Sequence, residues 1–185
     1  MTREDKAAFL YHFTSVLHLP AIVASRALIR TESNIGIDRP HAGPDCVWFV
    51  NTPDLGNFNL GVADQIGEKT AVRFTVAVPE YLALPWVEWA VGLGIDDRML
   101  RAVIKAGGGP EAAAQWRIVL RPVRVDRWVR VDRTDTGEAI WEQGQPLEQM
   151  TARTETEREE LKIRIQGKIA AMSDEEKGAR AAASP

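Results

Sequence analysis

Short apolar runs, separated by loops and by helical patterns, predict a mixed α and β fold. Strands rich in aromatic and β-branched residues are expected at residues 9–14, 46–51 and 70–78. The first strand leads into a short helix at residues 17–26, whose first turn contains Pro20, as the starts of helices often do. A strand that opens directly into a helix therefore begins the fold.

The middle of the chain predicts two short helices and a fourth strand region. Between residues 80 and 106, tryptophan and aliphatic residues recur at helical spacing on both sides of a glycine pair. The glycine-rich segment 107–110 lacks the lysine of a phosphate-binding P-loop, so we interpret it as a linker. Residues 115–123 then form the fourth strand region, which continues to residue 131 past Pro122, a residue typical of an edge, bulge or bend.

The composition changes near residue 146, where a charged helix is predicted. Residues 151–178 are dense in Glu, Arg and Lys. Apolar side chains recur there at spacings of four, four and three, at Leu161, Ile165, Ile169 and Met172. Such a narrow stripe packs either against the domain or against a partner chain. We therefore divide the chain into a domain at residues 1–145 and a charged C-terminal helix with a frayed tail at residues 146–185.

The charge balance excludes a globally basic surface. Lys and Arg number 23 against 26 Asp and Glu, for a net charge of -3, which is not the field of a typical nucleic-acid binder. A local basic strip remains open, at Arg117, Arg121, Arg124, Arg127 and Arg130. Such a strip either follows the phosphates of a nucleic acid or is a solvated strand face, neutralised by Asp126 and Asp132.

The cysteine count and hydropathy indicate a soluble protein of a reducing compartment. The one cysteine, Cys46, excludes an intramolecular disulfide framework and a cysteine-cluster metal site. No apolar run approaches the roughly 20 residues that span a bilayer, and the N-terminus lacks the apolar core of a signal peptide. The three histidines are widely separated and lack spaced acidic partners, so no metal site is predicted. We expect a cytoplasmic protein without a membrane partner.

His12 is the strongest candidate for chemistry, within Leu10-Tyr11-His12-Phe13-Thr14-Ser15. An imidazole on an apolar strand must find a hydrogen-bond partner, or its burial costs on the order of 1–3 kcal/mol. That partner is either a backbone carbonyl of the core or a bound ligand, and the residues alone leave both alternatives open. His18, at the start of the predicted helix, is interpreted as a surface or capping residue.

This segment, followed by Leu19-Pro20-Ala21-Ile22 and by the ring-bearing strand Val47-Trp48-Phe49, resembles the opening of the ADP-ribosyltransferase superfamily. The nearest relatives in style are the DarT-like enzymes that modify nucleic acid, and the resemblance covers about the first third of the chain. It implies an α+β fold with a split, mostly antiparallel sheet, peripheral helices and an appended charged C-terminal helix. It also implies NAD as the substrate, no metal, and a macromolecular acceptor, either nucleic acid or protein.

The resemblance further implies a role for each residue of the site. The His12 side chain would hydrogen-bond a ribose hydroxyl of NAD, and the main chain of Phe13 would bind the nicotinamide carboxamide. Thr14 would brace the first strand, and Trp48 or Phe49 would stack on the nicotinamide ring. The long loop at residues 31–46 would cover the dinucleotide and meet its phosphates through Ser33, Asn34, Arg39 and His41.

One position departs from the family pattern. Where the family commonly places a Glu that pairs with the ribose 2′-hydroxyl and assists the nucleophile, this chain has Gln115. Glutamine can hold a hydroxyl group but cannot act as a base or supply a negative charge. Glu111 can substitute if residues 110–115 are helical, because residues four apart share a helix face.

The sequence therefore leaves three functional hypotheses. The first is an NAD-dependent ADP-ribosyltransferase that acts on a macromolecular acceptor. The second, favoured by Gln115, is a catalytically silent member of the same fold that binds a nucleotide or a protein. The third is an interaction module without a ligand, in which His12 faces only protein.

Overall fold

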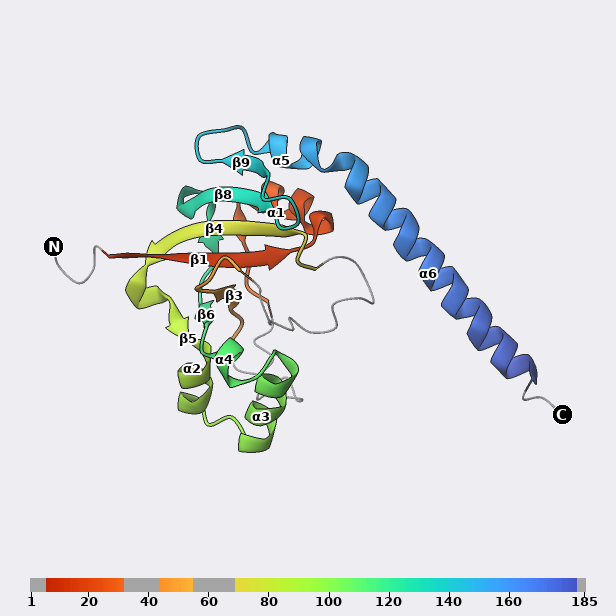
Figure 1. Cartoon of the computed structure of the whole chain (residues 1–185), viewed down its shortest axis with the longest axis horizontal. Coiled ribbons are helices and arrows are strands. Elements are labelled where there is room, and N and C mark those ends of the chain that lie inside the picture. The colour runs from red at the N-terminus through yellow and green to blue at the C-terminus, as the bar shows by residue number, and fades with distance from the viewer. Residues whose placement is uncertain (1–5, 32–43, 55–68, 183–185) are drawn as a thin grey trace.

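The protein has an α+β fold built on an antiparallel sheet (Figure 1). The computed structural model describes residues 6–31, 44–54 and 69–182, with side chains described as far as residue 171. From one edge to the other, the strands of the seven-stranded sheet are β5 (Leu84–Pro85), β6 (Trp116–Val119), β3 (Val47–Val50), β1 (Ala7–Thr14), β4 (Val72–Pro79), β8 (Trp128–Arg133) and β9 (Ala139–Glu142). A separate two-stranded sheet joins β2 (Ala27–Leu28) to β7 (Val123–Arg124).

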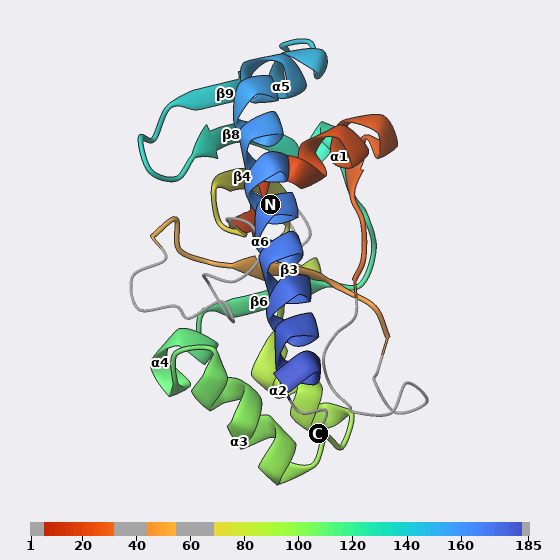
Figure 2. The same cartoon turned by 90° about the vertical axis from the view of Figure 1, so that its right-hand side faces the viewer.

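The shorter helices lie at the two ends of this sheet, and α6 starts at the β9 end and extends to the level of α2 and α3, as two perpendicular views show (Figures 1 and 2). Those grouped with β8 and β9 are η1 (Val16–His18), α1 (Leu19–Ser25), η4 (Val125–Arg127), α5 (Glu148–Arg153) and α6 (Glu155–Ala182). Those near the β5 edge are η3 (Glu80–Leu82), α2 (Trp86–Gly92), α3 (Asp97–Ala106) and α4 (Pro110–Ala113).

The structure confirms the first three strands and the paired helices, and it corrects the fourth strand region. β1, β3 and β4 fall within two residues of the predicted bounds, and α2 and α3 occupy the predicted helical segment. The region at residues 115–131, however, is not continuous, because β6, β7 and β8 belong to different places in two sheets. Pro122 lies between β6 and β7, where its missing N–H cannot continue a ladder.

Two apolar clusters lie on opposite faces of the large sheet. The first packs α1, α5 and the start of α6 against β1, β4, β8 and β9, and its largest fully buried side chains include Phe74 and Trp128. The second packs α2, α3 and α4 against β3, β5 and β6, around Trp86 and Trp116. Strand alternation produces this arrangement, because neighbouring residues of β1 and β3 contribute to different clusters. Each half of the sheet is thus covered mainly on one face.

The second cluster is organised around three tryptophans. The Trp48 ring lies 5.4 Å from that of Trp86 and 6.1 Å from that of Trp116, measured between centroids. Gly107, at the end of α3, approaches the Trp116 ring so closely that a Cβ atom there would lie 2.2 Å from Cζ2. Absence of a side chain at Gly107 is therefore what lets α3 end against this indole.

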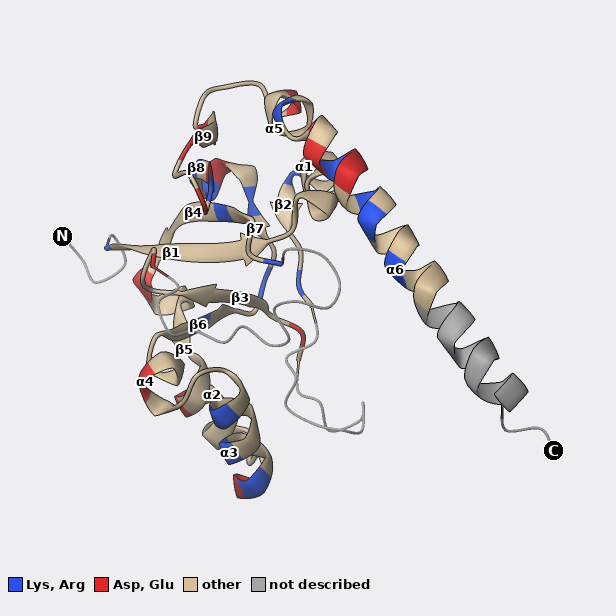
Figure 3. Cartoon of the chain, turned by 45° about the vertical axis from the view of Figure 1, so that its right-hand side comes forward, with Lys and Arg blue, Asp and Glu red and all other residues tan. Residues whose placement is uncertain are grey.

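The charged helix α6 packs on the domain only through its beginning. Leu161 is 4% exposed and belongs to the first cluster, and Ile165 packs partly against it. Ile169, one turn later, is 59% exposed, and the side chain of Met172 lies outside the described residues. In Figure 3 the first turns of α6 carry both acidic and basic residues, and the charged residues further along its described part are Lys and Arg. The predicted stripe therefore contacts the domain at its first two positions.

Candidate functional site

His12 lies where two neighbouring strands of the sheet separate. β1 pairs with β4 over its whole length, from Ala7 to Thr14, whereas its described register with β3 consists of the single pair Tyr11–Val50. Just beyond that pair, the His12 ring takes the place of a backbone N–H group, because its Nδ1 lies 2.8 Å from the Trp48 carbonyl oxygen. The imidazole therefore bridges the two strands where their ladder ends.

This contact fixes which ring nitrogen of His12 is available to a ligand. A carbonyl oxygen can only accept, so Nδ1 carries the proton and Nε2 presents a lone pair. Nε2 has no hydrogen-bond partner among the described residues, and the side chain remains half-buried rather than sealed in the core. Burial lowers the pKa of His12 below its usual 6.5, against the opposing effect of the Trp48 carbonyl, and the nearby His18 lowers it further. At neutral pH the ring is a neutral hydrogen-bond acceptor.

The residues beside His12 on the same face form a row across four strands. Phe74 of β4 and Phe49 of β3 flank the imidazole, with ring centroids at 6.3 and 5.8 Å. Phe49 is paired in turn with Arg117 of β6, and directly paired residues point to the same face of a sheet. The row Phe74–His12–Phe49–Arg117 thus places a cation on the His12 face, two strands away.

Neither of the predicted stacking residues, Trp48 and Phe49, offers an exposed ring beside His12. The Trp48 side chain points to the opposite face, into the cluster with Trp86 and Trp116, and only its carbonyl meets His12. Phe49 does share the His12 face but is only 3% exposed. The Trp48 ring therefore does not share the His12 face, because adjacent residues of a strand face opposite ways.

Phe13 and Thr14 continue β1 beyond its pairing with β3. The backbone of Phe13 is paired with Arg73 of β4, and its half-buried ring packs with the second cluster. Thr14 is 6% exposed, and its hydroxyl lies 3.0 Å from Nδ1 of His18. Thr14 therefore fastens the end of β1 to the turn before α1, and His18, itself exposed, is its partner.

Gln115 is the turn residue that immediately precedes β6. Its carbonyl accepts a hydrogen bond from the Asn51 backbone N–H at 3.1 Å, which extends the β3–β6 ladder by one step. Its side chain is half-buried, as is that of Arg117 two residues later. Glu111 is exposed on α4, which ends before Gln115, so the two are not on one continuous helix.

Other predicted contributors are outside the site as described. Ser33, Asn34, Arg39 and His41 lie outside the described residues. Cys46 is buried, and desolvation, with a smaller contribution from Asp45, raises the pKa of its thiol to about 12, so it is not a reactive thiolate. Within the described ranges, no group of three or more His, Cys, Asp or Glu is placed to hold a metal ion.

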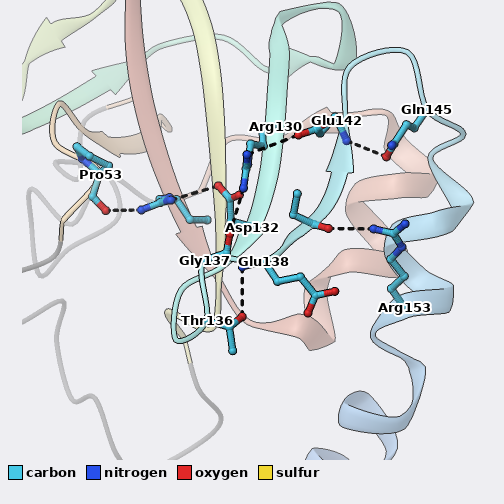
Figure 4. Close-up of polar contacts among 11 residues, drawn as sticks. Pro53, Arg130, Asp132, Thr136, Gly137, Glu138, Glu142, Gln145 and Arg153 are labelled. Atoms are coloured by element: carbon cyan, nitrogen blue, oxygen red, sulfur yellow. Dashed lines mark hydrogen bonds and ion pairs between the residues drawn. The ribbon is translucent and has the colours of Figure 1, made fainter.

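The arginines of the predicted basic strip do not form one surface. Arg130 contacts Asp132 and Glu142 and donates to the Gly137 carbonyl (Figure 4). Asp132 is 2% exposed and also pairs with Arg73, so it is held between two guanidinium groups. Arg124 and Arg127 both contact Asp126, at 3.8 and 3.9 Å.

Arg117 faces the other way from Arg130, because Arg130 pairs with Thr75 on the face of β4 opposite to Phe74. Arg117 therefore lies on the His12 face, which its assignment to the basic strip does not reveal. The signal that could have revealed it is the alternation of Arg117 with the apolar residues Trp116 and Ile118, which predicts that Arg117 faces away from them.

No protein-family model matches the chain, and comparisons with curated proteins and with solved structures find no match. Within the part of the chain that the structure describes, no helix is long and apolar enough to cross a membrane.

Proposed function

We propose that this protein binds NAD on the His12 face and transfers ADP-ribose to a macromolecular acceptor, in a split-sheet fold like that of the ADP-ribosyltransferases. The observation that carries the proposal is the state of His12. Its Nδ1–H is held by the Trp48 carbonyl where β1 and β3 separate, so that Nε2 can accept a hydrogen bond from a ribose hydroxyl. The lowered pKa of His12 favours the neutral ring that this role needs.

The described residues supply binding groups for such a ligand. The His12 imidazole accepts, the Gln115 amide both donates and accepts, and the Arg117 guanidinium donates. Strands lie about 4.8 Å apart, so residues on β1 and β6 are separated by roughly 10 Å, a span that fits a nucleotide rather than a single small group. The His12 and Arg117 side chains share one face, which a common ligand requires.

The reaction needs a site that stabilises developing positive charge. In transfer, the bond from ribose C1′ to the nicotinamide nitrogen breaks, and nicotinamide leaves with the electron pair. The acceptor nucleophile bonds to C1′ and releases its proton. A carboxylate would favour the ribosyl cation, whereas Gln115 offers only a dipole.

Gln115 therefore favours a second candidate function, in which the protein binds NAD or a related nucleotide without turning it over. The acceptor of the first function, whether nucleic acid or protein, and a partner chain for α6 remain parts of the same proposal. The two candidates differ in one observable, the release of nicotinamide.

The test of NAD binding is calorimetric titration of wild type, His12→Ala and His18→Ala. His12→Ala removes one hydrogen bond to the ligand and is expected to weaken NAD binding about three- to tenfold. His18→Ala removes an exposed imidazole from the same end of β1 and should leave NAD affinity within twofold. Wild-type protein without measurable NAD binding, or equal affinity in wild type and His12→Ala, would refute the proposed site.

The test of transfer is release of nicotinamide from labelled NAD in the presence of nucleic acid or protein extract. The transferase hypothesis predicts release with transfer of label, and Gln115→Glu is expected to raise the rate because it restores a charge beside the developing cation. Binding without release by wild type would establish the silent alternative. Glu111→Gln provides the matched control, since loss of release in this variant would assign the carboxylate role to Glu111.

A further inference from the structure

We infer that Arg117 forms a phosphate-binding subsite on the His12 face, so that the ligand of this face is a phosphorylated nucleotide and not a nucleoside. The inference rests on the proposed function for the identity of the ligand as NAD. The recognition of phosphate rests on two other observations, which are the fixed geometry of the Arg117 guanidinium and its lack of a carboxylate partner among the described residues.

The guanidinium of Arg117 is held in place from one side. Its Nη1 donates to the Ala114 carbonyl at 2.9 Å and to the Trp116 carbonyl at 2.8 Å. Both acceptors are main-chain atoms, one at the end of α4 and one at the first residue of β6, so they fix the group without neutralising its charge. This anchoring reduces the side-chain entropy that a ligand would otherwise have to remove.

The opposite edge of the same guanidinium is available. Among the described residues, Nε and Nη2 of Arg117 have no hydrogen-bond partner, and neither atom is sealed from solvent. Two parallel N–H groups on one edge match two oxygens of a phosphate or carboxylate. A pinned arginine with this edge open is preorganised to bind an oxyanion.

Among the described residues, the charge of Arg117 has no carboxylate partner. Arg73 on β4 and Arg130 and Arg133 on β8, by contrast, each contact a carboxylate. Arg117 is half-buried, and no described carboxylate lies within 4.0 Å of it. A partly desolvated cation without a counter-charge favours binding of an anion, because the anion restores the interaction that burial has weakened.

The position of Arg117 relates this anion site to His12. The two residues belong to one row across the sheet, with Phe49 between them. A ligand that hydrogen-bonds Nε2 of His12 through a ribose hydroxyl can therefore present its phosphoryl oxygens to β6.

The experiment compares ligands with and without phosphate. NAD, ADP, inorganic pyrophosphate and nicotinamide riboside are titrated into wild type, Arg117→Gln, Arg117→Lys and Arg121→Gln by calorimetry. Arg117→Gln should weaken NAD and ADP binding about 10- to 100-fold, as expected for loss of charge-assisted hydrogen bonds, and leave nicotinamide riboside within twofold. Arg117→Lys should recover only part of the affinity, because lysine retains the charge but not the paired donors.

Arg121→Gln is the matched control, since it removes the same charge from an exposed position four residues away and should leave every affinity within twofold. Circular dichroism and unfolding curves check that each variant is folded. Equal weakening of NAD and nicotinamide riboside in Arg117→Gln, or weakening of neither, would overturn the subsite. Arg117-dependent binding of ADP or pyrophosphate without any NAD binding would uphold the subsite and refute the proposed function. Binding of none of the four ligands to wild type would refute both.

Discussion

The two faces of the central strands use aromatic side chains in opposite ways. On one face, Trp48, Trp86 and Trp116 pack against one another and against helices, so that their rings serve the core. On the other, His12 and Arg117 remain half-buried and keep polar atoms open, with Phe49 filling the space between them. The rings that look most like ligand platforms in the sequence are thus structural. The available chemistry lies on the residues that alternate with them.

Removing the centre of the tryptophan cluster has the largest expected effect on stability. Trp86→Ala deletes a fully buried ring and is expected to reduce the free energy of unfolding by about 3–5 kcal/mol. Val91→Ala, at a 57% exposed position of the same helix, should change it by less than about 0.5 kcal/mol. Urea unfolding measures both, and a loss below about 1 kcal/mol in Trp86→Ala would contradict a structural role for this cluster.

A smaller effect is expected from acidification, through His12. The pKa of this residue is lowered in the folded state, chiefly by burial, so below pH 6.5 the unfolded chain binds a proton that the folded chain does not. Stability should therefore fall as the pH drops from about 7 through the folded pKa, by at most about 1.4 kcal/mol per pH unit. Unfolding free energies at pH 7.5 and 5.5 measure this loss.

His12→Asn serves as the reference for this pH effect, because it lacks the titrating group. The difference between wild type and variant should shrink as the pH falls. A constant difference between pH 7.5 and 5.5 would show that burial does not lower the pKa of the folded imidazole.

The smallest expected effect is that of Trp48→Phe on NAD affinity, and it tests whether the tryptophan face takes part in binding. Trp48→Phe retains the backbone carbonyl that accepts from His12 and keeps an aromatic ring in the tryptophan cluster. NAD affinity should therefore change by less than about twofold, since the ring faces away from the imidazole. A tenfold loss of affinity, measured by calorimetry on a variant of unchanged stability, would restore Trp48 as a ligand contact.

Regular patterns made much of the fold predictable from sequence. The alternation of Arg73 and Thr75 with apolar residues identified β4, and apolar runs identified β1 and β3. The short strand β9 and the one-turn helix α4 carried no such pattern, because their residues are placed by tertiary packing. Pro122 signalled a break, but sequence could not show that the chain passes there from one sheet to another.

The candidate site was predictable only in part, because it depends on register. His12 was identified by its polar ring on an apolar strand, and its partner proved to be the Trp48 carbonyl. That Phe49, not Trp48, shares its face follows from how β1 and β3 align, which composition does not specify. Arg117 was obscured for the same reason, since its neighbours in space come from strands far apart in the chain.

The close approach of Gly107 to Trp116 offers a remote means of adjusting this surface. Trp116 immediately precedes Arg117, with its ring in the tryptophan cluster and the Arg117 side chain on the opposite face of the sheet. Alanine at position 107 would collide with the indole and force it to move, carrying the start of β6 with it. A single methyl group on one face of the sheet would thus shift Arg117 on the other face, which is the face proposed to bind the ligand.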